Sequence, residues 1–227
     1  MVTPGGGALD IGTDHAYIPI YLAERGIKEK ILACDINKGP LAIAQGNIRA
    51  KGLEKKIAVC LSDGLEKTEI SPGDSVIIAG MGGLLIRDIL LRSDNKAKVA
   101  GELILQPQTE YSELRMYLSS TGFEITNEDM VEEDGKYYFV IRAVPSGKGA
   151  YDLSDAERDF GPVLLKKQHP LLREYLEKRL GTCREVLSRL EDAKPAENII
   201  KRMNEIKSEI NYIEEIIMRY FGMPDGR

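Results

Sequence analysis

The 227-residue sequence has no tryptophan, only three cysteines and only two histidines. Because Cys34, Cys60 and Cys183 are odd in number and far apart, we expect reduced packing residues and no disulfide framework. His15 and His169 are also distant from each other, which disfavours a zinc site, so we expect no bound metal. The sequence lacks an apolar run of about 18 residues and an N-terminal secretion signal. We therefore expect a cytoplasmic protein that does not span a membrane.

An excess of positive charge is also missing. The chain has 31 Lys and Arg residues against 36 Asp and Glu residues, which gives a net charge of −5. Nucleic-acid binding normally needs a basic surface, so any such surface must come from the arrangement of the cations. The chain length suits one domain plus an appendage, and an apolar content of 43% is enough to form a core.

Short β-branched segments alternate with helical patterns up to residue 144. This alternation is typical of an α/β fold whose parallel sheet is covered on both faces. We expect strands over Ala8–Ile11, Ile31–Asp35, Ile57–Leu61, Ser75–Ala79, Glu102–Gln106, Glu124–Val131 and Lys136–Val144. We expect helices over Tyr17–Arg25, Pro40–Lys51, Leu84–Arg92 and Tyr111–Ser120. The last two strands flank an Asp-Gly turn, which favours a hairpin. Seven strands with an antiparallel last one are the Rossmann-like pattern of class I methyltransferases, expected over residues 1–145.

The pattern changes to helix alone beyond the linker Pro145-Ser-Gly-Lys-Gly149. Apolar residues recur at heptad-like steps from Leu172 to Leu190 and again from Ile200 to Tyr220. Pro195 interrupts the helical pattern between these two segments. We therefore predict an antiparallel helical hairpin, a coiled-coil domain over residues 151–227.

The first strand breaks at one glycine, Gly12, in the segment Ala8-Leu-Asp-Ile-Gly-Thr-Asp-His-Ala-Tyr17, and Asp35 ends the second strand 23 residues later. This unit is typical of a nucleoside site, in which the acid accepts hydrogen bonds from both ribose hydroxyls. A pyrophosphate needs more glycines than this turn has, so NAD fits poorly and S-adenosyl-L-methionine fits well. Asp10 is placed to hold the ammonium group of this cofactor, and Ile36 follows the ribose acid. The alternative is a plain strand-to-helix turn.

Two further segments complete the predicted cofactor site. Ser62-Asp-Gly-Leu65 follows the third strand: Asp63 can accept a hydrogen bond from the adenine amino group, next to Gly64, while Leu65 packs on the ring. Ala79-Gly-Met-Gly-Gly83 follows the fourth strand, at the crevice where open α/β sheets bind ligands, so Ala79, Gly80 and Met81 are candidates. An Asp/Asn-Pro-Pro-Tyr motif is absent there, which disfavours methylation of exocyclic amines. Either acid could instead be a solvated strand end.

Candidate substrate and catalytic residues lie at the same edge. Gln106 and Pro107 end the fifth strand, where an amide can read a Watson–Crick edge. Asp14, His15 and Tyr17 supply a carboxylate, an imidazole and a stacking ring beside the expected methyl group. The structural alternative is that Asp14 caps the helix and Tyr17 is a half-buried aromatic residue.

These motifs resemble the bacterial tRNA (adenine-N1)-methyltransferases that act on adenosine 22, the TrmK type. The resemblance rests on Asp10-Ile-Gly-Thr-Asp-His-Ala-Tyr17 with Pro19, Ser62-Asp-Gly-Leu65, Ala79-Gly-Met-Gly-Gly83 and Leu103-Ile-Leu-Gln-Pro107, and it covers almost the whole chain. It implies methyl transfer from S-adenosyl-L-methionine to N1 of adenine in tRNA. Gln108 stands where we expect asparagine, and the first strand begins at residue 8 where similar proteins carry a preceding helical segment.

We expect tRNA as the partner of a monomeric enzyme. The predicted hairpin carries many cations on its outer faces, and Lys178, Arg179 and Arg184 are candidates to contact the RNA backbone. The alternative is an ordinary solvated coiled-coil surface. Two other functions remain open: methylation of a small molecule or protein by the same cofactor, and a cofactor-binding scaffold without turnover.

Overall fold

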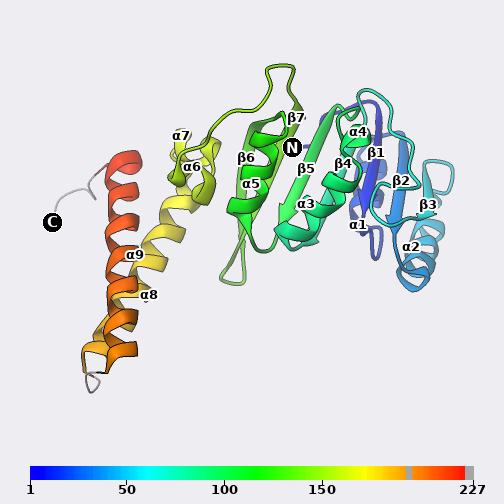
Figure 1. Cartoon of the computed structure of the whole chain (residues 1–227). Helices are drawn as coiled ribbons and strands as arrows, with labels where there is room; N and C mark the ends of the chain where they lie inside the picture. The colour runs from blue at the N-terminus through cyan, green and yellow to red at the C-terminus, as the bar shows by residue number, and fades with distance from the viewer. Residues whose placement is uncertain (193–195, 223–227) are drawn as a thin grey trace.

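A computed structural model describes residues 1–192 and 196–222 of the chain. Within these residues, seven strands form one mixed sheet in the order β3-β2-β1-β4-β5-β7-β6 (Figure 1). Strand β7 runs antiparallel to both β5 and β6, and the other neighbours pair in parallel, which confirms the predicted sheet. The strands are β1 (Gly7–Ile11), β2 (Lys30–Asp35), β3 (Ile57–Leu61), β4 (Ser75–Met81), β5 (Glu102–Pro107), β6 (Phe123–Glu133) and β7 (Lys136–Pro145).

Helices cover both faces of the sheet, which is why the central strands carry apolar residues toward both faces. Val76 and Ile78 of β4 face one core and Ile77 faces the other, and all three are buried. The first core also contains side chains of α3 (Gly83–Arg92), α4 (Asp94–Ala97) and α5 (Tyr111–Ser120). The second contains side chains of α1 (Tyr17–Glu24) and α2 (Lys38–Ala50). The predicted helices are thus present. Helix α4 was not predicted, because its four residues are too few to show a helical repeat of apolar residues.

The segment before β1 is held by a buried carboxylate at the amino-terminal edge of the sheet. Glu102 accepts hydrogen bonds from Thr3 N (2.8 Å), Ser75 Oγ (2.6 Å) and Arg142 Nε (2.6 Å). Burial alone would raise the pKa of Glu102, but these hydrogen bonds lower it to about 2. The residues before β1 are therefore fixed to β4, β5 and β7 without forming a helix of their own.

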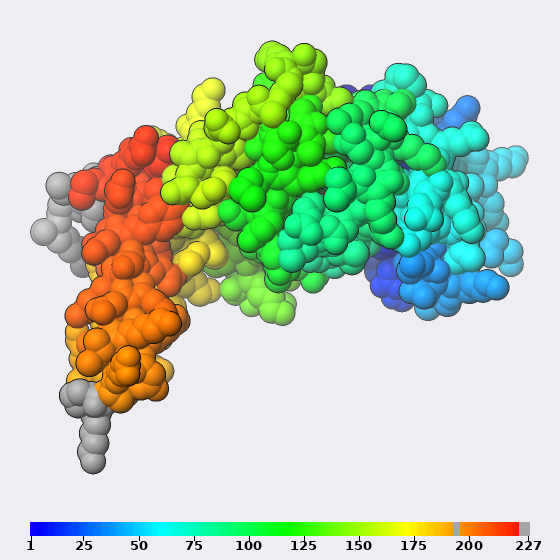
Figure 2. Space-filling model, in the orientation of Figure 1, coloured from blue at the N-terminus to red at the C-terminus, as the bar shows by residue number. Residues whose placement is uncertain are grey.

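Beyond the sheet, the described residues form four helices: α6 (Asp155–Phe160), α7 (Pro162–Lys166), α8 (Pro170–Glu191) and α9 (Glu197–Phe221). The two long helices pack side by side and project from the β6 edge of the sheet (Figures 1 and 2). This confirms the predicted hairpin, while its coiled-coil geometry stays a prediction. The expected break at Pro195 lies outside the described residues.

The hairpin does not have a core of its own. Met130 of β6 and Phe139 of β7 are buried in the same cluster as Leu172 and Leu176 of α8 and Ile213 of α9. The helical part therefore shares its hydrophobic core with the last two strands. A boundary between two domains at residues 146–150 stays a prediction.

A buried ion pair fixes this junction. Arg115 of α5 and Glu128 of β6 have fully buried side chains, and Arg115 Nε donates to Glu128 Oε1 at 2.8 Å. Arg115 Nη1 also donates to the carbonyl oxygens of Arg158 and Asp159 near the end of α6. Glu128 Oε2 accepts from Val163 N at the start of α7. The charges thus tie the sheet to the first two helices of the C-terminal part.

Candidate functional site

A cavity of about 370 Å³ opens at the carboxyl ends of β1, β2 and β4. This is the edge at which open α/β sheets bind ligands. Eight of the ten residues predicted to bind the cofactor line it: Gly12, Asp35, Ile36, Asp63, Gly64, Ala79, Gly80 and Met81. Asn37, Leu85 and Ile89 also line the cavity and were not predicted. The fold therefore brings together motifs that lie up to 69 residues apart in the sequence.

Gly12 forms the turn at the end of β1 with φ of 76°. The amides of Gly12 and Thr13 both donate to Cys34 O, each at 2.9 Å, which fixes the turn to the end of β2. A Cβ atom at position 12 would overlap the Cε atom of Met81, so only glycine fits without a shift of that side chain. Met81 therefore packs against the turn, and both residues line the cavity.

Asp35 ends β2 at the wall of the cavity. Its Oδ1 accepts a hydrogen bond from Asn37 N at 2.8 Å, which orients the carboxylate. Ile36 beside it is 59% exposed and offers an apolar surface at the rim. A carboxylate has four lone-pair sites, so Asp35 can accept further hydrogen bonds from a pair of hydroxyls.

Two cations of the α3–α4 corner hold the turn that contains Asp63. Arg92 makes a bidentate pair with Asp63, with Nη–Oδ distances of 3.0 and 3.1 Å. Lys96 Nζ donates to the carbonyl oxygens of Leu65, Glu66 and Thr68 at 3.1, 2.6 and 3.0 Å. These contacts fix the direction of the Asp63 carboxylate. The sequence did not reveal either contact, because Arg92 ends a predicted helix and Lys96 follows that helix, some 30 residues beyond the turn.

Asp10 and Leu65 are the two predicted cofactor residues that do not line the cavity. Asp10 is buried, and its Oδ2 accepts a hydrogen bond from Thr13 Oγ1 at 2.6 Å. Burial raises the pKa of Asp10 to about 6, against the opposing effect of the Thr13 hydrogen bond. Leu65 has no exposed surface and belongs to the core that also contains Ile89. In this structure Asp10 braces the Gly12 turn and Leu65 supports the Asp63 turn from behind.

The three predicted catalytic residues lie together where the turn after β1 meets the first residue of α1. The rings of His15 and Tyr17 stack with centroids 5.3 Å apart, and His15 Nε2 lies 3.3 Å from Asp14 Oδ2. Asp14 has a positive φ of 47°, as does Ala16 with 59°, so the turn is strained at two non-glycine positions. Asn47 of α2 donates to His15 O at 3.0 Å and supports it.

The structural alternatives for this turn do not hold. Ala16, not Asp14, is the N-cap of α1, and no side chain caps it. Tyr17 is 71% exposed and is not a half-buried packing residue. The turn therefore presents a carboxylate and two stacked rings to solvent next to Gly12.

Gln106 uses its amide within the protein. Its Oε1 accepts from Gly80 N at 2.9 Å and its Nε2 donates to Pro107 O at 3.0 Å. Gln108 N in turn donates to Met81 O at 2.8 Å. Gln106 and Gln108 thus brace the end of β4, and a substrate base would have to compete with Gly80 for the Gln106 side-chain carbonyl.

The predicted RNA-contacting cations lie far from the cavity, on α8 beyond the β6 edge of the sheet (Figure 1). Arg179 Nε donates to Glu209 at 2.8 Å and Arg184 Nη2 to Glu214 at 2.6 Å, both across the hairpin. Lys178 Nζ donates to Gly135 O at 3.1 Å. These three side chains therefore already have partners within the chain.

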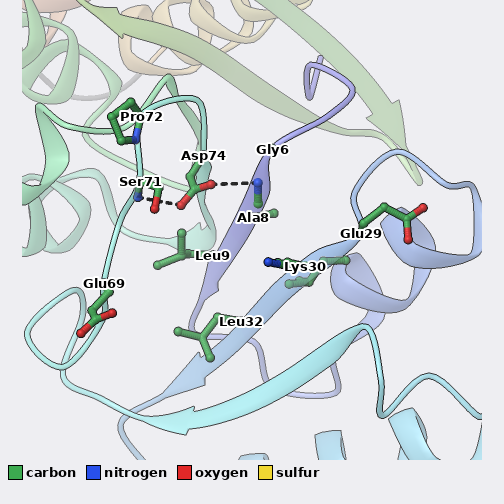
Figure 3. A pocket seen from close by; sticks show the side chains of 12 residues that line it. Gly6, Ala8, Leu9, Glu29, Lys30, Leu32, Glu69, Ser71, Pro72 and Asp74 are labelled. Atoms are coloured by element: carbon green, nitrogen blue, oxygen red, sulfur yellow. Dashed lines mark hydrogen bonds between the residues drawn. The ribbon is translucent and has the colours of Figure 1, made fainter.

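A second cavity, of about 600 Å³, lies at the opposite edge, beside the amino ends of β1 and β2 (Figure 3). The connection from β3 to β4 crosses there as an irregular segment, and Asp74 joins it to β1 by accepting from Gly7 N and Ser71 N, each at 2.8 Å. Both Asp74 oxygens are engaged in holding the backbone, and the cavity is remote from the strand ends that bind ligands. We therefore assign the functional site to the first cavity.

Two findings concern the expected absences. No helix within residues 1–192 and 196–222 is long and apolar enough to cross a membrane. The same residues contain no group of three His, Cys, Asp or Glu side chains arranged to hold a metal ion.

Known proteins share the whole architecture. The sequence model of the family described as TrmK, tRNA (adenine(22)-N(1))-methyltransferase, matches residues 8–215. The tRNA (adenine(22)-N(1))-methyltransferase of Bacillus subtilis (strain 168) is 30% identical over 94% of this chain and 92% of its own length. The crystal structure of the B. subtilis M1A22 tRNA methyltransferase TrmK has a TM-score of 0.78 at 29% identity, covering 95% and 94% of the two chains. M. capricolum TrmK in complex with S-adenosyl-homocysteine has a TM-score of 0.76 at 32% identity, covering 95% and 94%.

Proposed function

The chain belongs to the TrmK family of tRNA (adenine(22)-N(1))-methyltransferases, and we propose that it transfers a methyl group from S-adenosyl-L-methionine to N1 of adenosine 22 in tRNA. The observation that carries this proposal is the cavity at the carboxyl ends of β1, β2 and β4, with the strained Asp14–Tyr17 turn beside it. This arrangement combines a place for an adenosine-like cofactor with a carboxylate and two stacked rings in the chain segment just after Gly12.

The residues of the cavity fit S-adenosyl-L-methionine. Gly12 lines the cavity at the end of β1 and places no side chain there, which suits the methionine part of the cofactor. Asp35 would accept from the ribose hydroxyls, and Asp63 from the adenine amino group. The site has no run of glycine amides around a phosphate, and this cofactor carries none. When bound, it supplies an electrophilic methyl group attached to a sulfonium.

The chain's own residues then act on the target base. Neutral adenine has a lone pair on N1, so the reaction needs no general base. Holding N1 in line with the bond between the methyl carbon and the sulfur then accounts for most of the rate gain. His15 and Tyr17 would hold the base by stacking. Asp14 would stabilise the positive charge that methylation places on the ring. Gln106 and Pro107 would contact the edge of the base.

The hairpin would contribute a contact with the RNA backbone, away from the reacting atoms. Lys178, Arg179 and Arg184 are exposed on α8 and would exchange their present partners for phosphate oxygens. Such contacts position an RNA without reading its sequence. We also infer that the enzyme is cytoplasmic and monomeric. The support for a monomer is that the apolar residues of α8 and α9 next to the sheet are buried within one chain.

Methylation of an unmodified tRNA transcript with labelled cofactor tests this function. We expect 1-methyladenosine at position 22 after nucleoside analysis, and no incorporation into a matched transcript with another base at position 22. Transfer to a protein or small molecule in place of tRNA would favour the alternative in which the enzyme methylates that class of substrate. Cofactor binding without any transfer would favour a scaffold.

A further inference from the structure

Helix α1 has an aromatic outer face that the packing of the protein does not explain. Its inner face is buried in the second core by Pro19, Ile20, Leu22 and Ala23. On the opposite side Tyr17 and Tyr21 are 71% and 54% exposed, one helical turn apart. Large exposed aromatic side chains on a helix that already has a buried face indicate a binding surface.

The planar groups on this face form a row that begins at the candidate active site. The His15 ring stacks on Tyr17 at 5.3 Å, and the Arg25 guanidinium lies over the Tyr21 ring, 5.5 Å from its centroid. Tyr17, Tyr21 and Arg25 are spaced by four residues, so the row advances by about 6 Å at each step. It runs from the Gly12 turn along the length of α1, away from the catalytic edge.

This region is also basic within an acidic chain. Residues 15–56 contain eight Lys or Arg and four Asp or Glu, whereas the whole chain has a net charge of −5. Lys51, at the end of α2, lies 3.0 Å from Glu24 in the last turn of α1, which places the cationic end of α2 beside the aromatic row. Aromatic side chains interleaved with cations are the combination that binds unstacked nucleotides.

We propose that the outer face of α1 is an RNA-binding surface, on which a nucleotide next to the target base stacks on Tyr21 while Arg25 contacts its phosphate. The proposal rests on the proposed function, because the target base must first enter the site beside His15 and Tyr17. Strand continuity then brings the neighbouring nucleotide to α1, where a ring is already exposed. Stacking needs no particular base, so this surface supplies affinity and leaves the choice of nucleotide to the site.

The test compares Tyr21→Ala with Tyr21→Phe in the full-length protein. Stacking of a base on an aromatic side chain is worth about 1–3 kcal/mol, so we expect Tyr21→Ala to raise the Kd and the KM for tRNA by about 5-fold or more. Tyr21→Phe keeps the ring and is expected to bind tRNA like the wild type. Cofactor affinity, measured by calorimetry, is expected to be unchanged in both variants.

Leu91→Ala is the matched control, since Leu91 is 58% exposed on α3, over the opposite face of the sheet. A second variant, Arg25→Gln, is expected to reduce the salt slope of tRNA binding by about 0.7, the value for one contact to a single strand. Wild-type tRNA affinity in both Tyr21→Ala and Arg25→Gln would overturn this inference and leave the proposed function intact. A wild-type protein that neither binds nor methylates tRNA would overturn both.

Discussion

Asp35 is the residue at which the cofactor assignment is tested most directly. It is buried at the cavity wall and its carboxylate is oriented by Asn37 N. We expect Asp35→Ala to weaken S-adenosyl-L-methionine binding by about 1.5–3 kcal/mol, the cost of losing hydrogen bonds to a charged group. Calorimetry of the two proteins measures this directly, with melting temperatures to show that both are folded. Equal cofactor affinity would place the ribose elsewhere.

Asp14 is expected to affect turnover and not cofactor binding. Its carboxylate is two-thirds exposed in the turn beside Gly12, where it can interact with a cationic product base. We expect Asp14→Ala to lower kcat for tRNA by about 10-fold or more while cofactor affinity is retained, because the interaction develops only as the base becomes charged. Single-turnover kinetics separates this effect from product release. Turnover at the wild-type rate would remove Asp14 from the mechanism.

The raised pKa of Asp10 leads us to expect that the stability of the protein depends on pH. Its pKa is raised from 3.8 to about 6 by burial, so the folded state disfavours the ionised form. The stability of the wild type should therefore fall as the pH rises through the interval from about 4 to 6, by up to about 3 kcal/mol. Asp10→Asn cannot ionise and should lack this component. Urea unfolding of both proteins at several pH values gives the comparison, and parallel pH profiles would contradict it.

At the scale of elements, the sequence predicts what depends on local periodicity. The long apolar repeats of α8 and α9 specify a hairpin, and Leu172, Leu176, Leu180 and Cys183 are indeed buried. The same repeats overstate burial at the hairpin tip, where Leu187 and Leu190 are only partly buried and Ile200 is exposed, because no strand packs there. Helices α4, α6 and α7 have four to six residues and show no period of their own.

The candidate site also contains residues that the sequence predicts and residues that it does not. The strand-end acids could be predicted, because each follows an apolar strand and parallel strands end at one edge. Their partners could not, since Arg92 pairs with Asp63 over 29 residues and Gln106 with Gly80 over 26. Such pairs depend on how α3 packs against the sheet and on how β5 pairs with β4. A side chain such as Gln106, which the sequence suggests for substrate binding, can therefore make its hydrogen bonds within the protein instead.

The end of β4 and the start of α3 offer a prediction at this scale. Gln106 holds Gly80, at a φ of 76°, and Gly83 N donates to Thr109 O at 3.0 Å in the same corner. Gln106→Leu would remove the side-chain acceptor of the exposed Gly80 amide, at a cost of about 0.5–1.5 kcal/mol. We expect a lower unfolding free energy together with weaker cofactor binding, because Gly80 and Met81 line the cavity. Gln106→Glu keeps an oxygen at this position and should retain most of both. Equal loss in the two variants would show that the amide oxygen is not the essential atom.

For the whole molecule, the Arg115–Glu128 pair makes the sheet and the C-terminal helices depend on each other. Both side chains are fully buried, and they bind backbone groups of α6 and α7 as well as one another. Removing one partner leaves an unpaired buried charge, so we expect Glu128→Gln to cost about 3–5 kcal/mol of stability. The double variant Arg115→Met, Glu128→Leu leaves no charge and should be less destabilised than the single one. Urea unfolding measures the unfolding free energies of the wild type, the single variant and the double variant, and a double variant no more stable than Glu128→Gln would contradict this expectation.

Truncation after Gly149 follows from the same junction. The shortened chain would lose the carbonyl acceptors of Arg115 at Arg158 and Asp159, and the amides of α7 that bind Glu128. It would also uncover Met130 and Phe139, which are buried against the C-terminal helices. We therefore expect a marked fall in the melting temperature, with weaker cofactor binding as a consequence of partial unfolding and not of lost contacts, because no cavity residue lies beyond Ile89. Added cofactor should recover part of the melting temperature, since it binds only the folded state. A truncated protein that melts like the full chain would show that the sheet is stable without the helices, and would make the hairpin a separate domain.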